Sequence, residues 1–121
     1  MNKLLKPQIN QGEYVFVLID EIDKINQDDI LCSFKENGKY SLIVKKEYAD
    51  KYNLSYNFIA AWISLGLISS LDSFGLTSKF SRALAEQKIS CNVIAGYNND
   101  HIFVDHRDKE KAFEILSKLV F

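Results

Sequence analysis

The residues best placed for chemistry lie in one short segment, where a carboxylate, hydroxyls and a glycine precede an amphipathic helix. Residues 69–77 read Ser-Ser-Leu-Asp-Ser-Phe-Gly-Leu-Thr. The first N–H groups of a helix lack intrahelical partners and favour an anion such as a carboxylate. Gly75 permits close approach of the backbone, and Asp72 offers a carboxylate to an ammonium group. The segment predicts a binding site for a small molecule that carries both a carboxylate and an ammonium group. The alternative is that Asp72 or Ser73 is an ordinary N-cap of the helix.

A second set of residue types, Cys91, His101 and Asp105, is that of a thiol nucleophile, a base and an orienting carboxylate. Nothing in their sequence context groups them, so a small hydrolase ranks third among the functions considered. Cys32 and Cys91 lie far apart among apolar neighbours, which indicates reduced core thiols rather than a disulfide. No CxxC or HxxxH spacing offers a metal site. We therefore expect neither a metal nor a cofactor.

Strand patterns and turns alternate over the first half of the chain. β-branched and aromatic residues predict strands, and Asn37-Gly38 predicts a tight hairpin between the second and third of them. The acidic residues 20–29 between the first two strands predict a loop with one helical turn. The expected strands are 13–20, 30–34, 40–44 and 57–69, with a short helix at 46–52.

The second half begins with the clearest helix of the sequence. Leu76, Phe80 and Leu84 recur at helical spacing, and charged residues occupy the other face. A buried strand at 89–97 and a strand at 102–104 follow, joined by a polar turn. Asp108 is placed to cap a last helix that ends near residue 120.

The order of these elements indicates an α+β fold with antiparallel sheets and helices on one face. Two successive units, 1–57 and 58–121, resemble ferredoxin-like βαββαβ modules that share the central strand at about 58–68. The second unit lacks its final strand, and an open sheet edge tends to recruit one. Either residues 4–9 or a second copy of the chain would supply it. Pro7 counts against the first option because proline cannot donate to a strand ladder.

Residues 74–94 resemble the core signature of ACT domains, in which a glycine and an apolar residue open a helix with an Ala-Leu-Ala-Glu run. Here these are Gly75-Leu76 and residues 83–86. Phe74 stands where the family has proline, and Lys88 where it has glycine, so we expect a positive φ at Lys88. The resemblance extends to small bacterial proteins built of two ACT-like units, through AWISL (61–65), SSL (69–71), NVIAGY (92–97) and DHIFV (100–104).

The resemblance implies a regulatory module that binds an amino acid and has no catalytic activity. In aspartokinase regulatory domains the amino acid lies between the strand-to-helix loop of one unit and the facing strand of another. The matching positions are Asp72, Phe74, Gly75, Leu76, Asn92, Val93 and Ile94. A homodimer or a partner enzyme would receive the signal. The main alternative is a structural or protein-interaction module whose sheet edge pairs with another chain.

Composition restricts the environment and the partners. The 121 residues are enough for a hydrophobic core, and the net charge of −1 is spread along the chain, which disfavours nucleic acid as a partner. The longest apolar run, 58–71, is interrupted by serines and a glycine and is too short to cross a bilayer. The first residues lack the apolar stretch of a secretory signal. We expect a cytoplasmic protein that does not bind membranes.

Overall fold

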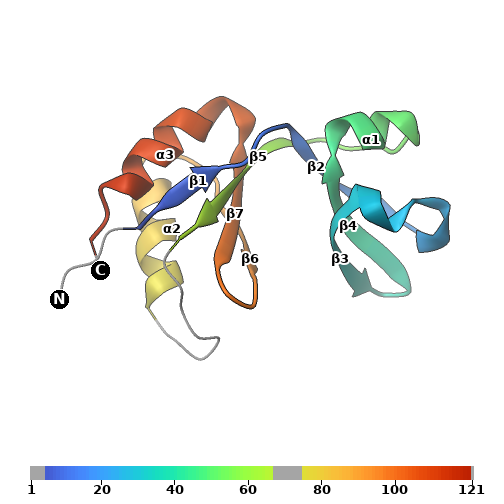
Figure 1. Ribbon diagram of the computed structural model, residues 1–121, viewed down its shortest axis with the longest axis horizontal. Coiled ribbons are helices and arrows are strands. Elements are labelled where there is room, and N and C mark those ends of the chain that lie inside the picture. The colour runs from blue at the N-terminus through green and yellow to red at the C-terminus, as the bar shows by residue number, and fades with distance from the viewer. Residues whose placement is uncertain (1–4, 67–74, 121) are drawn as a thin grey trace. The chain divides into compact units, whose positions relative to one another are not determined.

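The computed structural model describes residues 5–66 and 75–120, which form an α+β fold (Figure 1). The strand pairings recorded for these residues are antiparallel. Contacts divide the chain into two compact units. Gly12–Ala60 is named here the N-terminal unit, and Met1–Gln11 with Ala61–Phe121 the C-terminal unit.

The sheet of the N-terminal unit has the order β3-β4-β2, followed by the beginning of β5. Its elements are β2 (Tyr14–Ile19), β3 (Ile30–Glu36), β4 (Lys39–Lys45) and the helix α1 (Lys46–Lys51). Asn37 and Gly38 have φ values of 49° and 79°, as a tight hairpin of this type requires. The hairpin prediction is confirmed.

The connection from β2 to β3 consists of two short 3-10 turns. They span Ile22–Lys24 and Gln27–Asp29, where the sequence predicted a loop with one helical turn. Alternate residues of β2 and β4 face the core, because successive side chains of a strand point to opposite faces. That core contains Val15, Val17, Ile25, Leu42, Val44 and Ala49.

The strand β5 (Ile59–Leu65) takes part in both units. Ile59 and Ala60 pair with β2, and Ile63–Leu65 pair with β1 (Pro7–Ile9). The N-terminal segment therefore supplies a strand to the C-terminal unit, which is the first of the two options left open by the sequence. Pro7 is tolerated because it is the first residue of a strand whose one partner in the described sheet is β5.

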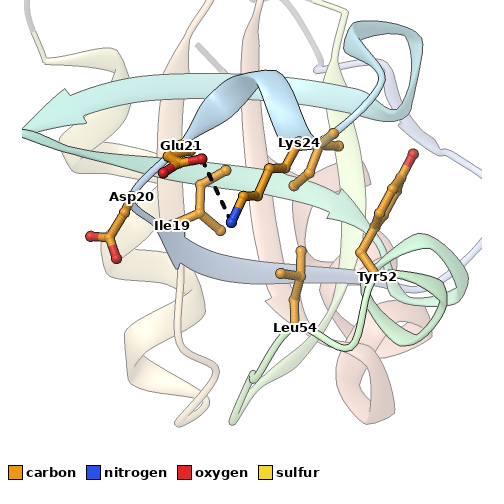
Figure 2. A pocket seen from close by; sticks show the side chains of 7 residues that line it. Ile19, Asp20, Glu21, Lys24, Tyr52 and Leu54 are labelled. Carbon is orange, nitrogen blue, oxygen red and sulfur yellow. Dashed lines mark ion pairs between the residues drawn. The ribbon is translucent and has the colours of Figure 1, made fainter.

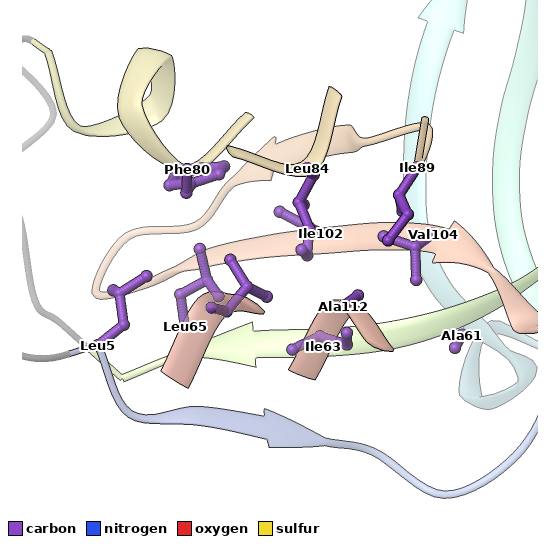
Figure 3. Close-up of a cluster of buried hydrophobic side chains, with 11 residues drawn as sticks. Leu5, Ala61, Ile63, Leu65, Phe80, Leu84, Ile89, Ile102, Val104 and Ala112 are labelled. Atoms are coloured by element: carbon purple, nitrogen blue, oxygen red, sulfur yellow. The ribbon is translucent and has the colours of Figure 1, made fainter. Parts of the chain in front are cut away.

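The C-terminal unit has the strand order β1-β5-β7-β6. Its later elements are α2 (Leu76–Glu86), β6 (Asn92–Ala95), β7 (Asp100–Asp105) and α3 (Lys109–Ser117). Phe80 and Leu84 of α2 meet Ile102 of β7 and Leu116 of α3 in a buried cluster (Figure 3). The amphipathic pattern of α2 is thus explained by this core, which also takes up Ile89.

Two local expectations differ from the structure, and one is confirmed. The strand predicted at 89–97 is shorter, because only Asn92–Ala95 pair with β7. Asp108 stands at the N-cap of α3 but makes no capping hydrogen bond, whereas Asp105 accepts one from the N–H of Arg107 at 3.0 Å in the 3-10 turn before it. Lys88 has a φ of 60°, as its position in the ACT signature predicts.

Among residues 5–66 and 75–120, no helix has both the length and the apolar character that a membrane crossing needs.

Candidate functional site

Gly75 is the N-cap of α2, the position that the sequence singled out. Its φ is 88° and its ψ is −20°, a left-handed conformation that costs a side-chain-bearing residue free energy. No side chain caps this helix start within the described residues, and the carbonyl of Gly75 accepts from the N–H of Lys79 at 3.2 Å. The first-turn amides that follow Gly75 are therefore the kind of donors that an anion uses.

The described residues leave space on the side of Gly75 where a side chain would project. Apart from Gly75 itself and its two chain neighbours, none of their atoms lies within 4 Å of a Cβ placed on this residue. Leu76, the next residue, packs against the hydrophobic cluster of the C-terminal unit. Asp72 and Phe74, the other two residues predicted on this loop, lie outside the described residues.

The three predicted residues on β6 divide between the two faces of that strand. Val93 packs against the same hydrophobic cluster as Leu76, so both side chains serve the core. Asn92 is exposed, and its Nδ2 donates to the carbonyl oxygen of Phe103 at 3.3 Å. Ile94 is half-buried and lies opposite His101 in the ladder with β7. Asn92 and Ile94 thus lie on the sheet face away from the helices.

That helix-free face carries a polar network which the sequence analysis did not predict. Nε1 of Trp62 donates to Nδ1 of His101 at 3.0 Å, and the hydroxyl of Ser64 lies 3.1 Å from the same nitrogen. Nδ2 of Asn10 donates to Oγ of Ser64 at 2.9 Å. The indole of Trp62 also stacks on Phe103, with ring centroids 6.3 Å apart. Residues from β5, β7 and the segment after β1 are joined in this way.

The donors in this network determine the protonation state of His101. An indole N–H can only donate, so Nδ1 of the imidazole must be the acceptor and the ring proton must be on Nε2. Ser64 accepts from Asn10 and can donate its own proton to the same Nδ1. Burial lowers the pKa of His101, and the nearby Asp100 carboxylate opposes this in part. The imidazole is therefore neutral at neutral pH.

The nucleophile, base and carboxylate considered in the sequence are not assembled into a triad. His101 is engaged by Trp62 and Ser64, and the carboxylate of Asp105 is engaged by the guanidinium of Arg107 at 3.0 Å. Burial raises the pKa of the Cys91 thiol to about 11, which makes its thiolate scarce. Cys32 and Cys91 are both free thiols. Across residues 5–66 and 75–120, no cluster of metal-ligating side chains is present.

A pattern in the sequence could have indicated the network. Trp62 and Ser64 alternate with the buried residues Ala61, Ile63 and Leu65, so they share the opposite face of the strand. No local signal in the sequence links Trp62 to His101, which follows it by 39 positions.

Solved structures similar to the chain include two bacterial proteins of comparable length. One is a Vibrio cholerae protein of unknown function, described as a possible transport protein; it is 32% identical, with a TM-score of 0.84 over 93% of this chain and 87% of its own. The other is an Agrobacterium tumefaciens protein with 15% identity and a TM-score of 0.75 over 94% of this chain and 87% of its own.

An aspartate kinase from Clostridium acetobutylicum, described as an allosteric enzyme, has 14% identity and a TM-score of 0.66. The similarity covers 93% of this chain but 33% of the kinase, and at this identity it reflects the fold alone. No functionally curated protein sequence matches the chain significantly.

Two family profiles match the chain, and both describe ACT domains. One covers residues 1–61 and the other residues 58–118, so that together they span nearly the whole sequence and meet at the beginning of β5. The resemblance noted in the sequence is confirmed: the chain belongs to the ACT-domain family.

Proposed function

We propose that this protein is a regulatory module that binds an amino acid at the start of α2 and catalyses no reaction. ACT domains are in general ligand-binding regulatory modules, and both halves of the chain match that family. The proposal includes two fused ferredoxin-like units that share the central strand. The observation that carries it is the left-handed Gly75 at the start of α2, where no side chain of residues 5–66 or 75–120 caps the helix.

The chemistry of the ligand follows from the groups on either side of Gly75. The first-turn amides of α2 and the positive end of its dipole suit a carboxylate. Asp72 would receive the ammonium group, and Phe74 would contact the ligand's side chain. Asn92 lies on the face away from the helices, so it would approach this ligand from a second copy of the chain and contribute its amide oxygen, since its Nδ2 is engaged by Phe103. Backbone groups of Val93 and Ile94 would complete the pocket.

A regulatory role agrees with the state of the reactive side chains. The Cys91 thiol has a raised pKa, and His101 is engaged by two donors, so neither is poised as a nucleophile or a base. The aspartate kinase with a similar fold is described as allosteric. By analogy, ligand binding here would act on a homodimer or on a partner enzyme in the cytoplasm, through differential affinity for two states.

The thermal midpoint of the full-length protein in the presence of each of the twenty amino acids tests this function. A ligand at about 100 times its Kd stabilises the folded state by about 2.7 kcal/mol. At least one amino acid should raise the midpoint, and an Asp72→Ala variant should lose that response. No rise with any amino acid would contradict an amino-acid effector.

A protein-interaction module is the second candidate, and the edge strand β3 favours it. This strand pairs only with β4 in the described sheet, and it exposes Leu31 by 40% and Phe34 by 70%. Unpaired strand edges with apolar side chains favour association. Light scattering of the wild type and a Phe34→Lys variant would separate the candidates, because association through this edge should weaken in the variant whether or not an amino acid is present.

A further inference from the structure

The helix α1 and the 3-10 turns pack on one face of the sheet in the N-terminal unit. Val17 and Val44 point to that face and meet Ala49 of α1 in the core. Tyr52 and Leu54 line a pocket on the same side (Figure 2). Side chains that alternate with the core residues along β2, β3 and β4 lie on the opposite face. That opposite face is called here the outer face of the N-terminal unit.

The strand register places apolar side chains of the outer face in two neighbouring rows. From β3 across β4 to β2, the rows are Phe34, Ser41 and Leu18, and then Cys32, Ile43 and Phe16. The first row is open to solvent at both ends, since Phe34 is 70% exposed and Leu18 is 58% exposed. Large apolar side chains that are exposed next to one another are typical of an interaction surface.

Charged side chains border the apolar rows at both ends. At the hairpin end, Glu36 lies opposite Lys39 in the strand register, and Nζ of Lys39 lies 3.6 Å from Oδ1 of Asp20. This row carries two carboxylates and one ammonium group. At the other end, Lys45 lies opposite Tyr14 in a row with one positive charge. The outer face is therefore acidic at one end and basic at the other.

We infer that the outer face binds the outer face of a second copy of this chain, in a two-fold dimer of stacked sheets. A two-fold axis perpendicular to the strands reverses their direction, so Lys45 of each copy lies over the row with Glu36 and Asp20 of the other copy. An axis parallel to the strands would bring the two acidic ends together, and like charges at close range oppose binding. The apolar rows meet between the charged ends, with the sheets about 10 Å apart. The same surface serves both copies, as a two-fold interface requires.

The size of the outer face determines the strength of this dimer. Three strands over the length between the charged rows make a face about 14 Å wide and about 20 Å long, or roughly 300 Å². A stable interface covers about 800 Å² per partner, so the dimer is weak and forms at high protein concentration. The inference goes beyond the proposed function, because it involves neither Gly75 nor an amino acid.

Sedimentation equilibrium of the full-length protein without added amino acids tests this inference. The average mass should rise from 13.9 kDa toward twice that value between about 10 µM and about 1 mM protein. Leu18→Lys places a charge in an apolar row and should weaken association at least about tenfold. Tyr97→Lys is the matched control, because Tyr97 is 87% exposed but belongs to the C-terminal unit, and it should leave association unchanged. The thermal midpoint of each variant reports its folding.

The border charges test the orientation of the two sheets. Lys45→Glu sets a carboxylate over the acidic row of the other copy and should also weaken association at least about tenfold. Adding Glu36→Lys in the same chain brings opposite charges together again and should recover most of the loss. A double variant that associates no better than Lys45→Glu alone would overturn the reversed stacking.

The remaining outcomes decide between the outer face and other modes of association. A constant mass of 13.9 kDa up to about 1 mM protein would overturn the inference. Association that is weakened by Phe34→Lys and unchanged by Leu18→Lys would place the contact at the β3 edge, since Leu18 stands on β2, two strands away from that edge. An equal loss in Tyr97→Lys would also overturn the assignment to the outer face.

Failure of the dimer and failure of the proposed function can be told apart. A protein that stays monomeric can still respond to an amino acid at Gly75 with a higher thermal midpoint. A protein that responds to no amino acid can still dimerise through the outer face, and Leu18→Lys would reveal this.

Discussion

The indole of Trp62 donates a hydrogen bond to Nδ1 of His101 at 3.0 Å, which keeps the imidazole neutral in the folded protein. The two residues stand on different strands, β5 and β7, of the C-terminal unit. Ser64 approaches the same nitrogen at 3.1 Å and its hydroxyl can reverse its direction, so protonation of Nδ1 would disrupt the bond from Trp62 in particular. The network therefore links the stability of this unit to pH.

Replacing Trp62 by phenylalanine should cost about 1–2 kcal/mol of unfolding free energy, because the hydrogen bond to His101 is lost while an aromatic ring remains over Phe103. Urea unfolding followed by circular dichroism measures the change. Tyr97→Phe is the control, since Tyr97 is 87% exposed, and its effect should stay within about 0.5 kcal/mol. Equal stabilities for wild type and Trp62→Phe would show that the bond contributes nothing.

The pKa of His101 is lowered below its usual 6.5, so its contribution to stability has a definite direction with pH. Above pH 6.5 the residue is neutral in both states and the contribution is complete. As the pH falls, the unfolded chain binds the proton first, and stability is lost between 6.5 and the lower pKa of the folded state.

The expected result is that His101→Asn flattens this dependence. Unfolding free energies at about pH 7.5 and about pH 5.5 should differ less in the variant than in the wild type. His106→Asn serves as the control and should retain the wild-type difference. Trp62, the only tryptophan, gives an independent fluorescence signal for the same titration. A wild-type slope that persists in His101→Asn would assign the pH dependence to another group.

Phe80 should be the most costly of the helix α2 residues to truncate, because its side chain is fully buried among β7, α3 and β5 residues. Phe80→Ala should lower the unfolding free energy by about 3–5 kcal/mol. Phe34→Ala, at a side chain that is 70% exposed, should change it by less than about 0.5 kcal/mol. Similar losses in the two variants would contradict the assignment of the core.

The Cys91 thiol should react slowly in the folded protein, because burial raises its pKa to about 11. At about pH 8 only about one such thiol in a thousand is ionised. In a Cys32→Ser background, alkylation of Cys91 by iodoacetamide should accelerate at least about tenfold when urea unfolds the chain. Rapid labelling of Cys91 in the folded protein would contradict the raised pKa and would support a role for this thiol as a nucleophile.

Much of the fold could be predicted because its signals are local. The Asn37-Gly38 turn and the helical spacing of Phe80 and Leu84 are signals from residues that are close together in the sequence. The structure contains both the predicted hairpin and the predicted helix. Asp108 stands at the N-cap of α3 as predicted, but its side chain makes no capping hydrogen bond, and Asp105 caps the separate 3-10 turn that precedes this helix.

The features that could not be predicted depend on residues far apart in the chain. The pairing of Pro7–Ile9 with Ile63–Leu65 required a choice between this chain and a second copy, which composition does not decide. The bond from Trp62 to His101 spans 39 positions, and no local pattern marks it. The connection between β2 and β3 folds as two short 3-10 turns, whereas the sequence predicted a single helical turn in a loop.

Amide chemical shifts at the start of α2 provide the most direct test of the proposed binding function. The N–H signals of Leu76, Thr77 and Ser78 should move on titration with the amino acid that raises the thermal midpoint, because its carboxylate binds these donors. The same amides in a Gly75→Ala variant should respond far less. Signals at Lys109 and Glu110, where α3 begins, serve as the control and should stay in place. Saturation with that amino acid without movement at Leu76–Ser78 would contradict a ligand site at this helix start.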